Sequence, residues 1–413
     1  MLTDPRVVSG ADSPRSGARV TMRTDITQAH CMNNRIKGIA PFHVMDILAR
    51  ARALEAKGRS IVHLEIGEPD FPTPKPILDA GMRALAEHKT FYTPALGLDA
   101  LREAIAQHYA DAAIEPARIA VTPGATGALL LALSLTLEAG DEVLMTDPGY
   151  PCNRHLAHLL GGIARPIPVD AATLFQLSAE RIRREWGPRT RAVLLASPAN
   201  PTGTLMADDE LREVVRVVRG LGGVVIVDEI YRGLTYGAVP PSAARYADAG
   251  NVYVVNSFSK YFGMTGWRLG WLLAPKTVSE AMDRVAQNIF LAPSTPAQYA
   301  ALAAFEADTL AELERRRALL DERRRFMLSA LRDIGFALPA EPQGAFYIYA
   351  ESSRFRDDSL RFVRELLDKT GVAITPGCDF GSHRAERFVR FSYANDMAVL
   401  QDGMQRLGAF LRG

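Results

Sequence analysis

The sequence predicts an α/β protein with a large domain, built on a mostly parallel sheet flanked by helices, and a smaller α+β domain. Short apolar runs of strand length alternate with amphipathic helical segments through the middle of the chain, which is typical of parallel sheets covered on both faces. Turns rich in glycine and proline follow several of these runs. The chain has 413 residues, 48% of them hydrophobic and 23% charged, so it is long enough for two globular domains.

The N-terminal segment differs from the rest of the chain. Residues 1–34 are rich in Arg, Ser, Thr, Asp and Gly, and they show no helical or strand periodicity. They also lack the apolar core of a signal peptide, so we expect a disordered extension. The predicted organisation then continues with an N-terminal arm and part of the small domain over 35–75, a large domain over 76–295, and a long helix with the small C-terminal domain over 296–413.

The regular elements follow from hydrophobic periodicity. Apolar residues recur at helical spacing from Pro41 until Gly58 ends the pattern. A strand is predicted over 61–66, then a breaker-rich loop over 67–74 and a helix over 76–87. In open parallel sheets, ligands bind at the carboxyl ends of the strands. Further strands are predicted at Ile119–Thr122, Glu142–Met145, Ala192–Ala196, Val224–Asp228, Val252–Ser257 and Leu269–Ala274.

The C-terminal third begins with a long helix, predicted over 295–333. Its middle, from Glu312 to Arg325, is densely charged. We interpret this run as a solvated helix face with i,i+4 pairing rather than a nucleic-acid-binding surface. Segments over 346–350 and 388–393 look like strands of the smaller α+β domain.

Charge and cysteine content exclude several classes of function. Lys+Arg 48 against Asp+Glu 47 leave a net charge of +1, which favours neither nucleic acid nor an anionic membrane as partner. Cys31, Cys152 and Cys378 lie far apart without metal-ligand spacing, so we expect no metal site and a reducing, cytoplasmic location. No apolar stretch reaches the roughly 18 to 20 residues that span a bilayer.

Polar residues of complementary chemistry follow two neighbouring strands. The first strand ends at Asp228 and is followed by Tyr231, and the next ends at Ser257 and is followed by Lys260. Arg268 comes eight residues later. These residue types can hold pyridoxal 5'-phosphate: lysine bonds to its aldehyde, aspartate keeps its ring nitrogen protonated, tyrosine donates to its ring hydroxyl, and serine and arginine bind its phosphate. A lone lysine is usually a surface cation, so the order and spacing of the set carry the prediction.

With these motifs, the sequence resembles the class I and II pyridoxal-phosphate-dependent aminotransferases of fold type I, a group that includes aspartate, aromatic and alanine aminotransferases. The resemblance runs from Arg35 to the C-terminus. It implies a seven-stranded, mostly parallel sheet in the large domain. It also implies that Lys260, Asp228 and Tyr231 are catalytic, with pyridoxal 5'-phosphate as the cofactor and Ser257 and Arg268 as its phosphate ligands.

The resemblance assigns further cofactor contacts. Ala125 and Thr126 lie in a Gly-Ala-Thr-Gly turn that matches the family's phosphate cup, where small residues precede a helix. Tyr150 matches an aromatic residue that stacks on the cofactor ring. Asn200 matches an asparagine that donates to the ring hydroxyl. Tyr92 matches a tyrosine that reaches the phosphate of the neighbouring subunit, which implies a homodimer with shared active sites.

Substrate binding is implied for a second set of residues. Arg390 matches the arginine that binds the α-carboxylate of the amino acid, with Asn200 beside it and a backbone contact from Gly67 opposite. The implied mechanism is ping-pong transfer between an amino acid and a 2-oxo acid, with Lys260 as nucleophile and general acid/base. Opposite a protonated ring nitrogen, we expect the pKa of Asp228 to be lowered.

Proteins of this fold type also have functions other than aminotransfer. Fold type I also hosts decarboxylases, β-lyases that cleave carbon–sulfur bonds, and cyclopropane-forming synthases. Aminotransfer is favoured because Arg390 and Asn200 together hold the carboxylate, which leaves Cα–H as the bond to break. Regulators that carry an aminotransferase-like domain need a DNA-binding domain ahead of it, and residues 1–34 are too few and contain no recognition helix.

The substrate side chain is predicted from the residues expected around it. Members specific for dicarboxylates place a basic residue at one of two positions, where this chain has Thr126 and Phe290. An apolar pocket, with Ile39 as a candidate member, favours neutral or aromatic amino acids. An aspartate-specific enzyme and a C–S β-lyase are the alternatives.

Overall fold

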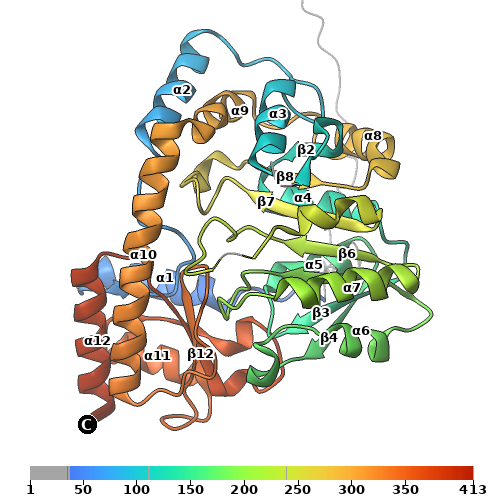
Figure 1. Ribbon diagram of the computed structural model, residues 1–413. Helices are drawn as coiled ribbons and strands as arrows, with labels where there is room; N and C mark the ends of the chain where they lie inside the picture. Colours follow the sequence, from blue (N-terminus) through green and yellow to red (C-terminus); the bar gives the residue numbers. More distant parts are fainter. Residues whose placement is uncertain (1–34, 36–37, 110–111, 239, 413) are drawn as a thin grey trace, which may run out of the picture.

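A seven-stranded sheet forms the centre of the larger part of the molecule (Figure 1). The computed structural model describes residues 35, 38–109, 112–238 and 240–412. Among the strands of these residues, the order is β2-β8-β7-β6-β5-β3-β4, and β8 alone runs opposite to the others. The predicted α/β fold with a mostly parallel sheet is therefore confirmed. The strands are β2 (Ile119–Thr122), β3 (Glu142–Asp147), β4 (Ile163–Pro168), β5 (Thr190–Ala196), β6 (Val224–Asp228), β7 (Val252–Ser257) and β8 (Gly270–Leu273).

Helices cover both faces of this sheet. In β6, Val225 and Val227 belong to one apolar cluster and Ile226 to another, so successive side chains face opposite covers. The first cluster includes residues of α3 and α7, and the second includes residues of α4 and α8. The helix bounds are α2 (Lys75–Ala86), α3 (Asp99–His108), α4 (Gly124–Ser134), α5 (Pro151–Leu159), α6 (Ala179–Glu185), α7 (Asp208–Gly220) and α8 (Ser279–Ile289).

The two ends of the described chain together build a second region, here called the small-sheet region. Figure 1 shows α1, in blue, beside the orange and red elements of the C-terminal end. A three-stranded antiparallel sheet has the order β11-β12-β9, and β1 pairs with β10 in parallel. The region contains α1 (His43–Glu55), β1 (Val62–His63), β9 (Tyr347–Glu351), α11 (Ser359–Thr370), β10 (Val372–Ala373), β11 (Thr375–Pro376), β12 (Phe388–Ser392) and α12 (Met397–Arg412).

The long helix predicted over 295–333 is interrupted. The chain forms α9 (Thr295–Leu302), a short 3-10 turn over 303–305, and then α10 (Ala307–Ile334). Glu306 is extended at the break, with φ −67° and ψ 146°. The ring of Phe305 packs against Phe258 and Phe262 in the core, and this tertiary contact competes with continued helix. The prediction of one continuous helix was therefore wrong.

Two strand predictions also need correction. The strand expected over 61–66 is only Val62–His63, because the carbonyl groups that follow are bound elsewhere: that of Leu64 accepts from Ser392, and that of Glu65 accepts from side chains. Conversely, β4 was not predicted. Prolines at two of its six positions hide the strand pattern, and proline is tolerated because β4 is an edge strand.

The charged middle of α10 matches its prediction in part. Arg316 pairs with Glu312 and Arg325 with Asp321, both at i,i+4 spacing. Arg323, however, is only 6% exposed and belongs to no solvated face.

Arg323 instead binds the carboxylate of Asp70 through two nitrogens, at 2.7 and 3.0 Å. Because the two residues are 253 positions apart, the local charge pattern does not predict this pairing.

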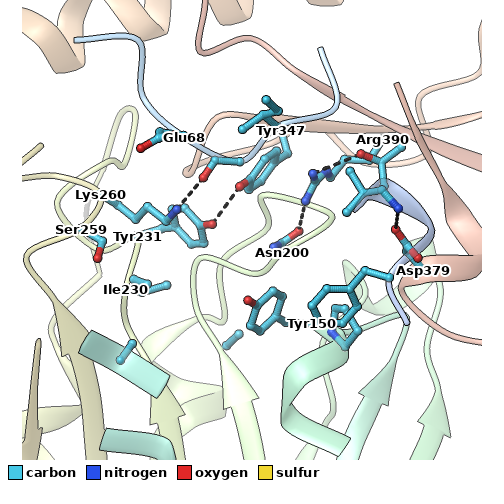
Figure 2. Close-up of a pocket in the computed structure, with 18 of the residues that line it drawn as sticks. Glu68, Tyr150, Asn200, Ile230, Tyr231, Ser259, Lys260, Tyr347, Asp379 and Arg390 are labelled. Atoms are coloured by element: carbon cyan, nitrogen blue, oxygen red, sulfur yellow. Dashed lines mark hydrogen bonds between the residues drawn. The ribbon is translucent and has the colours of Figure 1, made fainter. Parts of the chain in front are cut away.

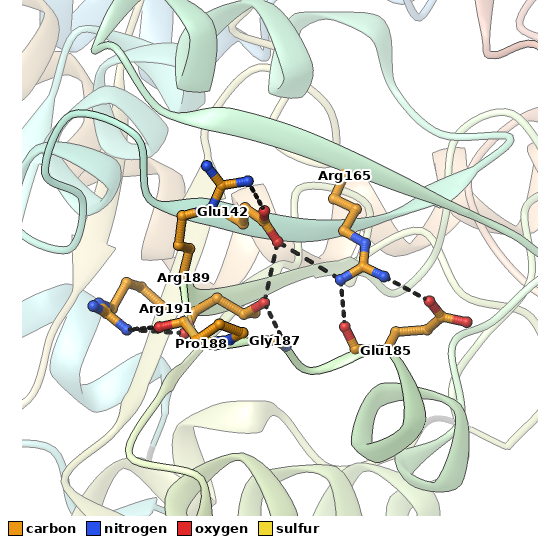
Figure 3. A network of polar contacts seen from close by, with 8 residues as sticks. Glu142, Arg165, Glu185, Gly187, Pro188, Arg189 and Arg191 are labelled. Carbon is orange, nitrogen blue, oxygen red and sulfur yellow. Dashed lines mark hydrogen bonds and ion pairs between the residues drawn. The ribbon is translucent and has the colours of Figure 1, made fainter.

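A polar network lies at the amino-terminal ends of β3 and β5 (Figure 3). Glu142, the first residue of β3, pairs with Arg189 at 2.8 Å and lies 3.6 Å from Arg165. Arg165 also pairs with Glu185 at 2.9 Å. Ion pairs thus link the amino-terminal ends of these strands.

Two sequence predictions lie beyond this description. The extension over 1–34 falls outside the described residues, and the domain boundaries at 75 and 295 stay predictions. Within the described part of the chain, no helix combines the length and apolarity needed to cross a bilayer.

Candidate active site

A cavity of about 420 Å³ opens where the carboxyl ends of β5, β6 and β7 meet the small-sheet region. Parallel strands bring loops from distant parts of the sequence to this edge. The cavity contains almost all of the predicted site residues, namely Gly67, Ala125, Thr126, Tyr150, Asn200, Asp228, Tyr231, Ser257, Lys260, Arg268 and Arg390.

Tyr92 is the predicted site residue that does not line this cavity. Its side chain is 82% exposed, and that of the neighbouring Phe91 is 81% exposed. Two residues considered for the substrate pocket, Ile39 and Phe290, are likewise missing from the lining formed by the described residues. The apolar wall is formed instead by Phe42, Val44, Met45, Leu48, Ile66 and Phe380.

A buried carboxylate and a partly buried amine lie at the carboxyl ends of two neighbouring strands. Asp228 ends β6, where one carboxylate oxygen accepts from the backbone of Ile230 at 3.0 Å. Burial raises the pKa of Asp228 to about 6 and lowers that of Lys260 to about 8. The expected lowering of the Asp228 pKa assumed a cation at the ring nitrogen, and in the protein alone burial has the larger effect. Figure 2 shows the Lys260 amine bound to a backbone carbonyl, that of Gly67.

One end of the cavity is rich in hydrogen-bond donors. Ser257, Ser259, Thr126 and the guanidinium of Arg268 line it beside the N-terminus of α4. Arg268 has a left-handed backbone with φ +53°, an uncommon conformation for a residue other than glycine. Gly124 has φ +71°, a conformation that favours glycine, and a Cβ there would lie 2.5 Å from an Arg268 nitrogen. Free backbone N–H groups and a nearby guanidinium make this end suitable for a phosphate.

Arg390, a residue of strand β12, lies at the opposite end of the cavity. One guanidinium nitrogen donates to Asn200 Oδ1 at 2.9 Å, and the other donates to the Glu65 carbonyl at 2.7 Å (Figure 2). The side chain is 5% exposed, and its Nε atom is buried without a hydrogen-bond partner among the described residues. A buried cation with an unused donor is suited to an anionic ligand.

An aromatic pair connects the two ends. The hydroxyl groups of Tyr231 and Tyr347 lie 2.9 Å apart. Burial, followed by the contact with Tyr347, raises the pKa of Tyr231 well above its ordinary value. Both phenols therefore stay protonated near neutral pH.

Several lining residues were missed from the sequence. Ser259 could have been found, because it is a second hydroxyl two residues after Ser257. Glu65, Glu68 and Tyr347 carried no such signal, since they enter the site only through tertiary packing.

The shape and chemistry of the cavity fit pyridoxal phosphate. A donor-rich end suits the phosphate, the partly buried Lys260 amine could react with the aldehyde, and the buried Asp228 carboxylate could bind a cation. Burial of Asp228 is costly in the protein alone, and a protonated ring nitrogen would offset that cost.

Fold and site together define a transferase of fold type I, with a lysine, a carboxylate and an anion-binding end at the carboxyl edge of a mostly parallel sheet. A profile of the family "Aminotransferase class I and II" matches residues 59–407. The chain belongs to this family and is an aminotransferase.

Related proteins agree with this assignment over almost the whole chain. The sequence is 39% identical to a valine–pyruvate aminotransferase of Mycobacterium tuberculosis, covering 91% of this chain and 97% of the relative. The structure is similar to an aminotransferase from the same organism, with a TM-score of 0.89, 39% identity, and coverage of 92% and 99% of the two chains. It is also similar to aspartate aminotransferase from Thermus thermophilus, with a TM-score of 0.87, 33% identity, and coverage of 92% and 99%.

Proposed function

We propose that this enzyme transfers the amino group of a neutral or aromatic L-amino acid to a 2-oxo acid, with pyridoxal 5'-phosphate bound at Lys260. The observation that carries the proposal is the meeting of Lys260, Asp228, Arg268 and Arg390 in one cavity of about 420 Å³. Ser257, Ser259, Thr126 and Arg268 would hold the phosphate, with backbone donors at Ala125. Tyr150 would stack on the ring.

The protein residues prepare the substrate for loss of one proton. The bound cofactor supplies a ring that withdraws electrons from the substrate Cα. Arg390 binds the α-carboxylate, supported by Asn200 and Gly67. Lys260 Nζ then removes the Cα proton, and a pKa of about 8 leaves part of its population neutral near physiological pH. Asp228 and Tyr231 hold the ring nitrogen and the ring oxygen.

The apolar wall supports a neutral or aromatic side chain. Among the described residues lining the cavity, the cationic side chains are Lys260, Arg268 and Arg390, and each already has a proposed partner. Besides Asp228, three acids line the cavity, namely Glu65, Glu68 and Asp379, and they would disfavour a second carboxylate. The similarity to a valine–pyruvate aminotransferase agrees with this preference.

Two alternatives remain distinguishable by experiment. An aspartate-specific enzyme would need a cation from a second subunit, and a C–S β-lyase would need a leaving group on Cβ. Each of the twenty amino acids is to be added to the loaded enzyme, and loss of the cofactor absorbance followed. We expect fast half-reactions with neutral or aromatic amino acids and slow ones with aspartate, whereas pyruvate and ammonia from cysteine conjugates would support the lyase.

The proposed attachment of the cofactor to Lys260 can be tested directly. Borohydride reduction of the yellow enzyme should fix the cofactor on the peptide that contains Lys260. Lys260→Ala should retain cofactor bound through its phosphate but lose turnover, because the proposed base at Cα is gone. Label on another lysine would overturn the assignment.

We also propose a homodimer with shared active sites, located in the cytoplasm. The exposure of Phe91 and Tyr92, outside the cavity of their own chain, supports a contact with a second copy. Cys152 and Cys378 are free thiols, which suits a reducing compartment.

A further inference from the structure

Tyr347 lines the cavity between its two ends. Its hydroxyl has no role in the proposed aminotransfer steps. The residue is on β9 and is 1% exposed. Its hydroxyl lies 2.9 Å from that of Tyr231. Figure 2 shows Tyr347 between Tyr231 and Arg390. A Cβ built on Gly67 would lie 2.2 Å from the Tyr347 oxygen, so the backbone of the Gly67 loop packs directly against this hydroxyl.

The ring of Tyr347 is held firmly in place. The Arg390 Cζ atom lies 4.1 Å from the ring centroid, within the range of a cation–π contact. On another side, the rings of Tyr231 and Tyr347 meet edge to face, with centroids 5.7 Å apart and an interplanar angle of 82°. The Tyr347 ring thus contacts both Arg390 and Tyr231.

The direction of the hydrogen bond follows from counting protons. Each phenol has one proton, so only one of the two can donate across the contact. If Tyr231 donates to the ring oxygen of the cofactor, its proton is used there. Tyr347 must then donate to the Tyr231 oxygen. A phenol that accepts a hydrogen bond is in turn a stronger donor.

We propose that Tyr347 is a positioning residue that donates to Tyr231, directs the Tyr231 proton toward the cofactor's ring oxygen, and links this donor to the substrate clamp at Arg390. The inference rests on the proposed function, because it requires an acceptor in the cavity for Tyr231. The contrasting role is purely structural, with the Tyr347 ring filling space and its hydroxyl dispensable.

The test removes one oxygen atom. Tyr347→Phe keeps the ring beside Arg390 and loses only the hydroxyl. The loaded enzyme is titrated with pH, and protonation of the cofactor-linked Lys260 nitrogen is followed by visible absorbance. Its pKa should rise by about 0.3 to 1 unit, because a weaker donor leaves more negative charge on the ring oxygen beside the protonated nitrogen.

A double-mutant cycle tests whether the effect passes through Tyr231. Tyr231→Phe alone should raise the same pKa by more than Tyr347→Phe does. In the double variant, Tyr347→Phe should add nothing further, because the donor that it supports is already absent. Additive shifts would overturn the inference.

A matched control lies on the same strand. Tyr349 is 3% exposed, and its hydroxyl has no hydrogen-bond partner among the described residues, so Tyr349→Phe should leave the titration unchanged. If Tyr347→Phe shows the normal absorbance of lysine-bound cofactor but no change in the pKa of the Lys260 nitrogen, this inference is wrong and the proposed function still stands. If the wild-type enzyme shows no absorbance of lysine-bound cofactor, the proposed function fails and this inference fails with it.

Discussion

At the scale of single residues, Arg390 combines deep burial with an unused donor, and this predicts a large effect on substrates alone. Arg390→Ala should weaken binding of both the amino acid and the oxo acid by about 2–5 kcal/mol, as when one partner of a buried charge pair is removed. Half-reaction rates measured against substrate concentration give this value. Affinity for the cofactor should remain nearly unchanged, and a parallel loss of cofactor would mean that Arg390 is a structural residue.

His63 predicts a pH dependence of stability. Its ring lies 2.8 Å from the buried carboxylate of Glu65, and this hydrogen bond is the main reason why the pKa of His63 is raised from 6.5 to about 8. A raised pKa stabilises the folded state fully below the unfolded value, and this stabilisation is lost as pH rises through about 8.

The measurement compares urea unfolding of the wild type and His63→Gln on both sides of this range. The difference in unfolding free energy should be about 1–2 kcal/mol at acidic pH and should fall toward zero in alkali. A difference that does not change with pH would show that His63 contributes by packing alone.

The predictability of site residues depended on where they lie in the sequence. Asp228 ends one apolar strand and Lys260 lies three residues after the next, so their positions at the sheet edge could be predicted together with their chemistry. Tyr347 and Glu65 carry no such mark. Tyr347 meets Tyr231 across 116 positions of sequence, and this contact exists only after the small-sheet region packs on the large sheet.

At the scale of elements, α10 is joined to the loop that contains Gly67. Arg323 binds Asp70 through two hydrogen bonds and lies over the ring of Phe71, with 5.0 Å from Cζ to the centroid. Both partners belong to the loop predicted over 67–74. The helix therefore fixes the backbone that faces Lys260.

Removing the contact between Arg323 and Asp70 should make the protein less stable. Arg323→Met should lower the free energy of unfolding by about 3 kcal/mol, because it leaves a partly buried carboxylate unpaired. Arg325→Met is the matched control two residues further along the helix. Its side chain is 67% exposed, so we expect a change within about 0.5 kcal/mol. Equal losses in chemical denaturation would contradict the role assigned to Asp70.

Element predictions succeeded where local pattern and tertiary packing agree. The apolar runs over 224–228 and 252–257 formed strands at the expected positions, because both of their faces are buried. The break after Leu302 was missed because alanine-rich sequence favours helix on both sides of it. The ring of Phe305 packs on the core at this turn, and such a tertiary contact has no local sequence signal.

At the scale of the whole molecule, the shared-site proposal predicts complementation between defective chains. Lys260→Ala chains should be inactive, and Tyr92→Phe chains should bind cofactor weakly. A mixed dimer would contain one site with both defects and one with neither. The mixed dimer should therefore have about half of the wild-type activity, and an equal mixture of the two variants about a quarter after complete subunit exchange.

Exchange itself is checked with labelled subunits. Activity that stays low despite proven exchange would show that Tyr92 acts within its own chain. A fully active monomer in analytical ultracentrifugation would exclude shared sites altogether.

The pairing of β1 with β10 has a consequence for synthesis. Val62 is made early, but its partner Val372 and the strand of Arg390 leave the ribosome near the end. The large sheet, with Lys260 and Asp228, can fold while the chain is still growing. A nascent chain would thus assemble the part proposed to hold the cofactor before the part proposed to hold the substrate. Under the proposed function, a nascent chain that has not yet reached Arg390 would lack the residue that binds the substrate carboxylate.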